Sequence, residues 1–150
     1  MLLIILIGCG LAIVTTFVHS LAMMAGLWAL RTSGVRRWIA GSAVSKAAAV
    51  ASLVLIMLLA TVIESGIYAG TFMAVGAMQD IETAVYFSMV TYTTLGYGDV
   101  VMHDQWRLLA SFEAANGIIM FGWTTALIFA SVHLIYLKKD DTGVGGVAGI

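Results

Sequence analysis

The stretch Ile81–Asp99, IETAVYFSMVTYTTLGYGD, decides how the rest of the chain is interpreted. Its first part, Ile81–Thr93, is apolar, aromatic and compatible with a helix, and Asp80 stands before it as a good N-cap. A helix of about a dozen residues rises roughly 20 Å, about half to two-thirds of the hydrocarbon core of a bilayer. The stretch therefore predicts a re-entrant helix, which enters a membrane without crossing it.

Two glycines separated by one residue, Gly96 and Gly98, follow this expected helix. Non-helical backbone at membrane depth is tolerated only where protein buries it or where it lines a polar cavity. Glycine adopts positive φ without a Cβ penalty, so alternating positions can reverse and successive carbonyl groups can point the same way. Such a stack of oxygens suits a dehydrated cation. Because one chain supplies only one side of the stack, several copies must surround an axis.

Composition places this stretch in a membrane protein. The chain has 150 residues, of which 61% are hydrophobic and 10% charged, with no proline, and its mean hydropathy is +1.03. A soluble domain is nearer half apolar and about a quarter charged. A net charge of −1 from seven basic and eight acidic residues excludes disorder and a basic nucleic-acid-binding surface. The one cysteine excludes an intrachain disulfide, and no Cys/His cluster suggests zinc.

Three stretches are long and apolar enough to cross the bilayer: Leu2–Leu30, about 43–78, and Leu108–Leu137. The first lacks a basic n-region, so we interpret it as a retained span and not as a signal peptide. Six of the seven basic residues fall on one predicted side: Arg31, Arg36, Arg37, Lys46, Lys138 and Lys139. The positive-inside rule makes that side cytoplasmic. We therefore expect the N-terminus outside, the C-terminus inside and the segment 76–107 facing outward.

The stretch TLGYGD resembles the potassium-channel selectivity filter, T-V-G-Y-G-D, with leucine in place of valine. The resemblance implies a homotetramer in which four such segments converge on an axis. It further implies that the Leu95 side chain faces away from that axis. The residues that it implies for the filter and for K⁺ binding are Thr94, Leu95, Gly96, Tyr97 and Gly98, with K⁺ held by the first four.

The third span looks like the inner helix of two-span bacterial potassium channels. The resemblance implies a gating hinge at Gly117, a residue that costs roughly 1 kcal/mol of helix propensity relative to alanine. Close packing is an equally physical reason for this glycine. Residues at helical spacing form a stripe that either lines the pore or packs ordinarily: Ile118, Phe121, Thr125, Phe129 and His133. The histidine forms either a ring of four charges when protonated or a lipid-interface residue.

The sequence departs from this family near the filter. No proline follows Asp99, and Tyr86 and Phe87 stand where many relatives have a tryptophan pair. Val90 occupies a position at which some relatives have a glutamate that hydrogen-bonds to the filter aspartate. We expect these residues to support the filter, and Asp99 must find a partner other than that glutamate.

Several acidic residues leave alternatives open. Glu64 and Glu113 lie within or near the membrane, where ionisable groups are costly and often functional. They either hold the re-entrant helix from behind, through Ser88, Thr91 or a tyrosine, or act directly on ions or protons. On the outer side, four acidic residues and Arg107 form either an acidic vestibule that concentrates cations or a solvated loop of mixed charge: Asp80, Glu82, Asp99 and Asp104.

We therefore expect an all-α membrane protein with three transmembrane helices and one re-entrant pore helix with its filter loop. Its parts are an N-terminal transmembrane helix (1–30), a cytoplasmic basic loop (31–42), a channel pore domain (43–137) and a cytoplasmic tail (138–150). The expected function is passive, potassium-selective permeation through a homotetramer in the plasma (bacterial inner) membrane. The alternatives are a weakly selective monovalent cation channel and a non-conducting membrane scaffold. We expect no enzymatic activity, no cofactor apart from the permeant K⁺, contact with membrane lipids and no nucleic-acid partner.

Overall fold

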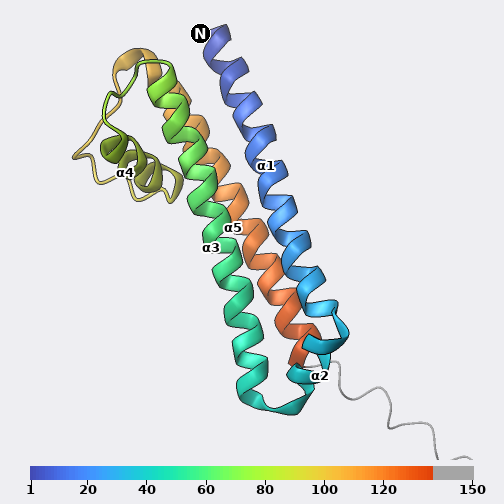
Figure 1. Ribbon diagram of the computed structural model, residues 1–150. Coiled ribbons are helices and arrows are strands. Elements are labelled where there is room, and N and C mark those ends of the chain that lie inside the picture. The colour runs from blue at the N-terminus through green and yellow to red at the C-terminus, as the bar shows by residue number, and fades with distance from the viewer. Residues whose placement is uncertain (137–150) are drawn as a thin grey trace, which may run out of the picture.

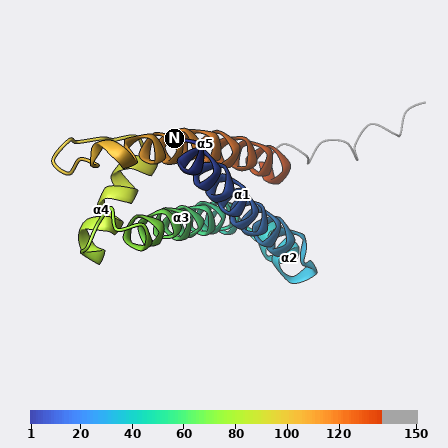
Figure 2. The same ribbon diagram turned by 90° about the horizontal axis from the view of Figure 1, so that it is seen from above.

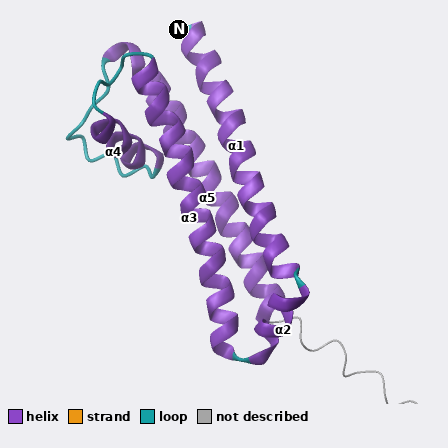
Figure 3. Cartoon of the chain, in the orientation of Figure 1, coloured by secondary structure: helices purple, strands orange, loops and turns teal. Residues whose placement is uncertain are grey.

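The computed structural model describes residues 1–136, apart from the side chains of Arg36 and Ala40. The predicted cytoplasmic tail, with Lys138 and Lys139, lies outside the described residues. Within them the chain is helical and contains no strand (Figures 1 and 3). The elements are α1 (Leu2–Arg31), α2 (Ser33–Gly41), α3 (Ala43–Ala74), α4 (Ile81–Tyr92), the 3₁₀ turn η1 (Asp104–Trp106) and α5 (Arg107–Tyr136).

Three of these helices, α1, α3 and α5, are long and apolar enough to cross a membrane. They contain 30, 32 and 30 residues. At 1.5 Å per residue, each rises about 45 Å or more, which exceeds the roughly 30 Å hydrocarbon core. The three predicted spans are therefore confirmed.

Local sequence signals explain where the helices begin and end. The Ser42 hydroxyl accepts from the Ser45 amide at 3.1 Å, and the Ser45 hydroxyl accepts from the Ser42 amide at 3.2 Å, which forms a capping box before α3. Gly76 adopts φ +71° just beyond the end of α3, where a left-handed residue commonly ends a helix. Asp80 caps α4, because its carboxylate accepts from the Thr83 amide at 2.8 Å. The N-cap predicted from sequence is confirmed.

The connection 31–42, predicted as a basic loop, contains the nine-residue helix α2. Extended backbone at Thr32 and Ser42 separates α2 from the helices on either side. Val35 and Trp38 are three residues apart and so share a helix face. That face lines an apolar hollow against α1 and α3. Tertiary packing of this short face explains why the connection is helical.

The helices are arranged so that α1 packs against both α3 and α5 (Figures 1 and 2). Helix α4 packs between the ends of α3 and α5, toward the end of the molecule where the N-terminus lies, and α2 lies at the opposite end (Figures 1 and 2). The larger hydrophobic cluster joins α3, α4 and α5 through Tyr68, Phe72, Phe87, Tyr92, Met102, Leu109 and Met120. A smaller cluster nearer α2 joins α3 and α5 through Leu53, Met57 and Leu127, and partly buried residues of α1 pack against it, among them Met23 and Leu27. The packing thus fixes α4 and the start of the segment after it.

Candidate functional site

The segment that follows α4 is tied to the end of that helix by backbone hydrogen bonds. The Val90 carbonyl accepts from the amides of Leu95, at 3.0 Å, and Gly96, at 3.3 Å. The Thr93 hydroxyl donates to the Met89 carbonyl at 2.6 Å. These bonds satisfy carbonyl groups that the end of a helix leaves unpaired. They also fix the direction in which the chain leaves α4.

Backbone conformation alternates along the next residues. Gly96 has φ +55° and Gly98 has φ +80°, so both glycines adopt the positive φ expected from their spacing. Thr94 also has a positive φ, +61°. Such a φ is uncommon for a β-branched residue, and strained backbone of this kind clusters at functional sites. Positive φ therefore occurs at every second residue from 94 to 98.

The same segment is uncovered within a single chain. All residues from Thr94 to Asp99 are exposed, and Leu95 and Tyr97 expose 58% and 67% of their surface. Most of α4, by contrast, has neighbours in α3 and α5. Non-helical backbone is not stable in lipid unless protein or water covers it. One subunit by itself therefore does not supply the cover that this segment would need in a membrane.

Asp99 has a partner on α4. The Tyr86 hydroxyl donates to Asp99 Oδ2 at 2.6 Å, and the Val100 amide donates to Oδ1 at 3.0 Å. The hydrogen bond from Tyr86 holds the pKa of the Asp99 carboxyl below its usual range. Since Val90 offers no polar side chain, Tyr86 supplies the partner that the aspartate was expected to need. The structure thus brings together two of the predicted supports.

The other two predicted supports are part of the core. The ring of Phe87 meets Phe72 of α3 edge-on, with the ring centroids 5.5 Å apart. The side chain of Val90 is buried, and its carbonyl binds the two amides described above. Both residues therefore anchor α4 and the segment after it, although neither contacts Asp99 through a hydrogen bond.

Gly117 lies directly beneath the last residue of α4. A Cβ added to this glycine would overlap the backbone carbonyl oxygen of Tyr92. The structure therefore gives close packing as a sufficient reason for glycine at this position. The gating hinge that the family resemblance implies for Gly117 stays a prediction.

The predicted pore-lining stripe forms one face of α5. Ile118, Phe121, Thr125, Phe129 and His133 are all exposed in the single chain. The opposite face is buried and includes Met120, Leu127 and Ser131. The ring of Phe121 also meets Tyr92 edge-on, with centroids 6.2 Å apart. The stripe is therefore a free face of the subunit beside the uncovered segment, and its lining role stays a prediction.

The carboxyl groups of the three long helices, Glu64 of α3 and Glu113 of α5, differ in their surroundings. Glu64 Oε2 accepts from the Tyr92 hydroxyl at 2.5 Å, so this glutamate of α3 contacts α4 through a tyrosine. Glu64 Oε1 lies 2.9 Å from Nδ1 of His19, on α1. Both oxygens of Glu113 are buried without a hydrogen-bond partner within residues 1–136. Sequence reasoning missed His19, although an ionisable residue in an apolar span was the available signal.

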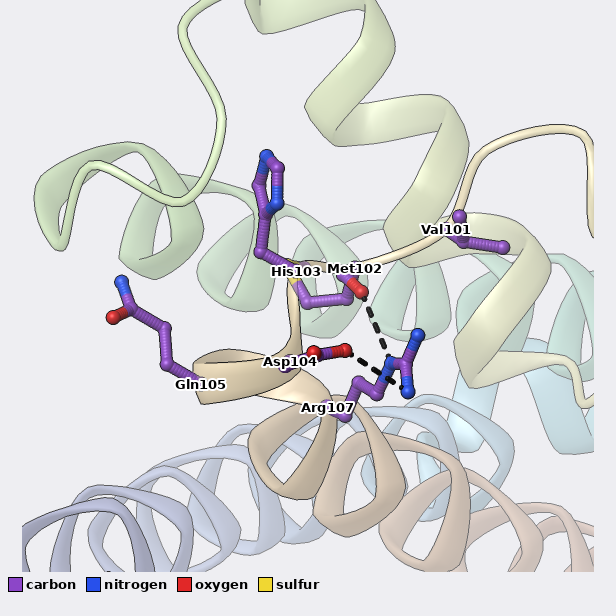
Figure 4. Close-up of a pocket in the computed structure, with 6 residues that line it drawn as sticks. All are labelled: Val101, Met102, His103, Asp104, Gln105 and Arg107. Atoms are coloured by element: carbon purple, nitrogen blue, oxygen red, sulfur yellow. Dashed lines mark hydrogen bonds and ion pairs between the residues drawn. The ribbon is translucent and has the colours of Figure 1, made fainter.

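The two connections on either side of α4 carry charges of both signs. Asp104 forms an exposed ion pair with Arg107 at 3.0 Å, and Arg107 Nε donates to the Met102 carbonyl at 3.4 Å (Figure 4). These residues border an open surface hollow. The Thr83 amide, which donates to Asp80, keeps the pKa of that carboxyl below its usual value. Of these acidic groups, Asp80 caps α4 and Asp104 is paired with arginine.

Comparison with known proteins identifies a family for this chain. A family model described as "Ion channel" matches residues 49–133, more than half of the chain. The calcium-gated potassium channel TvoK of Thermoplasma volcanium is 40% identical over 58 residues, which make up 38% of this chain and 17% of the relative. The chain thus spans less than a fifth of that relative's length. No solved structure matches it significantly. By the extent of the family match, the chain belongs to this ion channel family.

Proposed function

We propose that the chain is one subunit of a homotetrameric channel that lets K⁺ pass through the plasma (bacterial inner) membrane. The observation that carries this proposal is the exposed segment Thr94–Asp99, in which positive φ alternates directly after a helix too short to cross a bilayer. In that arrangement the K⁺ ligands are the carbonyl groups of Thr94, Leu95, Gly96 and Tyr97. Gly98 supplies the last reversal of the backbone.

Assembly of several copies follows from what one subunit leaves uncovered. Both the segment 94–99 and the stripe on α5 are exposed in the single chain. The non-helical backbone of the segment needs cover in a membrane. Four copies around an axis enclose the segment and turn the stripe toward a central path. Gly117 then lies where α5 meets α4, as a packing residue and as the proposed hinge.

Potassium is favoured over other monovalent cations by the sequence of the segment. TLGYGD differs from the potassium-channel filter motif at one position, and the relative TvoK is described as a potassium channel. The clustering of basic residues around α2 supports a cytoplasmic location for that end of the molecule. The N-terminus and α4 then lie toward the outer side.

A flux assay tests the proposal. The full chain in liposomes should take up rubidium and potassium, exclude sodium and be blocked by barium. Gly96→Ala should abolish uptake, because left-handed backbone costs a non-glycine residue about 1–2 kcal/mol in each subunit. Within the single chain no atom lies within 4 Å of an added Cβ, so the cost within one subunit is conformational.

The matched control is Gly10→Ala, which adds the same methyl group to an exposed helical glycine of α1. It should conduct normally. Full activity of Gly96→Ala would overturn the filter assignment. Equal sodium and potassium uptake would replace the proposal with a weakly selective cation channel, and a folded tetramer without flux would replace it with a membrane scaffold.

A further inference from the structure

A chain of buried hydrogen bonds joins α1 to the end of α4. His19 of α1, Glu64 of α3 and Tyr92 of α4 are all fully buried. Nδ1 of His19 lies 2.9 Å from Glu64 Oε1, and the Tyr92 hydroxyl donates to Glu64 Oε2 at 2.5 Å. The two oxygens of one carboxylate therefore bind one group from each of the other two helices.

The imidazole of His19 is held from its other side as well. Nε2 lies 3.1 Å from the Thr124 hydroxyl of α5, and the ring stacks on Trp123 with centroids 5.9 Å apart. With the proton on Nδ1, the ring donates to Glu64 and accepts from Thr124, so both nitrogens are satisfied. A ring fixed at both nitrogens and on one face holds the glutamate in one orientation.

Tyr92 connects these buried hydrogen bonds to the candidate filter of the proposed channel. It is the last residue of α4 and stands two residues before Thr94. Its carbonyl packs against Gly117, and its ring meets Phe121, so only the hydroxyl group remains to be oriented by a polar partner. A shift of this side chain moves the backbone from which the segment 94–98 begins.

We propose that His19 is a positioning residue for ion selection, acting through Glu64 on Tyr92. This inference rests on the proposed function. Residue 19 lies outside the family match, which begins at residue 49. In this role α1 contributes to ion selection, because its histidine holds Glu64 and so supports the candidate filter from the side opposite the pore. Removing one donor from a buried carboxylate costs free energy, because the carboxylate oxygen loses its partner. We therefore expect His19, Glu64 and Tyr92 to act as a unit.

The experiment uses the full chain in liposomes and measures the ratio of rubidium to sodium permeability. His19→Leu removes the donor to Glu64, and Tyr92→Phe removes the other donor. We expect each to lower the ratio about tenfold, the effect of losing about 1.4 kcal/mol. The double variant should be no lower than either single variant, because coupled groups are non-additive. His19→Asn, which keeps an N–H near the position of Nδ1, should restore most of the ratio.

The matched control is Thr15→Val, which removes a different buried hydrogen bond of α1, the one that Thr15 Oγ1 accepts from Asn116 Nδ2 of α5 at 2.7 Å. It should leave the ratio unchanged. Assembly of every variant is checked by size-exclusion chromatography. If His19→Leu does not assemble, Tyr92→Phe must still lower the ratio and His19→Asn must still preserve it.

Three results would overturn the inference: an unchanged ratio in the assembled variants, effects that multiply to about a hundredfold in the double variant, or an equal loss in Thr15→Val. The first result would show that His19 has no role in ion selection. The second would show that His19 and Tyr92 act on selection independently of each other. The third would show that any lost hydrogen bond of α1 lowers the ratio. Failure of the wild-type chain to take up rubidium would refute the proposed function itself. The inference alone fails if the wild type conducts selectively and the variants match it.

Discussion

Gly117→Ala tests whether close packing beneath α4 is a requirement of the channel. The added Cβ would overlap the Tyr92 carbonyl oxygen, and it would lie 2.9 Å from the carbonyl carbon and 3.3 Å from Cα of the same residue. All three neighbours are backbone atoms, so no flexible side chain can move aside. The end of α4 or α5 itself must shift.

The magnitude follows from two opposing effects. Alanine is favoured over glycine within a helix by about 1 kcal/mol. Extra carbon in a packed core costs about 1–3 kcal/mol, and a backbone neighbour places Gly117 in the upper part of that range. We therefore expect a net destabilisation of about 1–2 kcal/mol per subunit. The required shift also moves Tyr92 and with it the start of the candidate filter.

The assay is thermal unfolding of the purified oligomer in detergent, combined with rubidium uptake in liposomes. Gly117→Ala should unfold at a lower Tm than the wild type and lose most of its uptake. Gly10→Ala is the control: no atom lies near its added Cβ, and it should gain slightly in Tm. If Gly117→Ala were as stable as Gly10→Ala and changed only the opening of the pore, the packing argument would be wrong and the hinge would be favoured.

Two further predictions concern Asp99 and the start of α4. Tyr86→Phe removes the hydroxyl that holds the pKa of Asp99 low, so the pKa of this carboxyl should rise. As the solution is acidified from neutral pH, Asp99 of the variant should then lose its negative charge at a higher pH than Asp99 of the wild type. The midpoint of acid inhibition of rubidium uptake should rise, and an unchanged midpoint would show that this bond has no part in permeation. Asp80→Ala removes the cap that accepts from the Thr83 amide, so its Tm should fall below that of Glu82→Ala, which removes the same charge from the first turn of α4 without removing the cap. Equal Tm values would mean that charge, and not the cap, stabilises the start of α4.

Features that depend on neighbouring residues were predictable from the sequence. Hydropathy over some thirty residues identified the three spans, because each helix satisfies its own backbone within the bilayer. Asp80 and the apolar run after it placed the start of α4, because an N-cap acts over three residues. The spacing of Gly96 and Gly98 indicated their positive φ, because only glycine adopts it freely. The helix α2 was missed, because its nine residues are stabilised by contact with α1 and α3.

The sequence by itself therefore determined a three-span membrane protein with one short helix and a TLGYGD segment, since these follow from composition, capping and backbone preference. Only the tertiary structure decided what holds that segment. Tyr86 as the partner of Asp99, His19 as the second partner of Glu64, and the fit of Gly117 against Tyr92 join residues 13, 45 and 25 positions apart. Hydrogen bonds and steric contacts act over a few ångströms in space, and no spacing in the sequence specifies which distant residues packing brings that close.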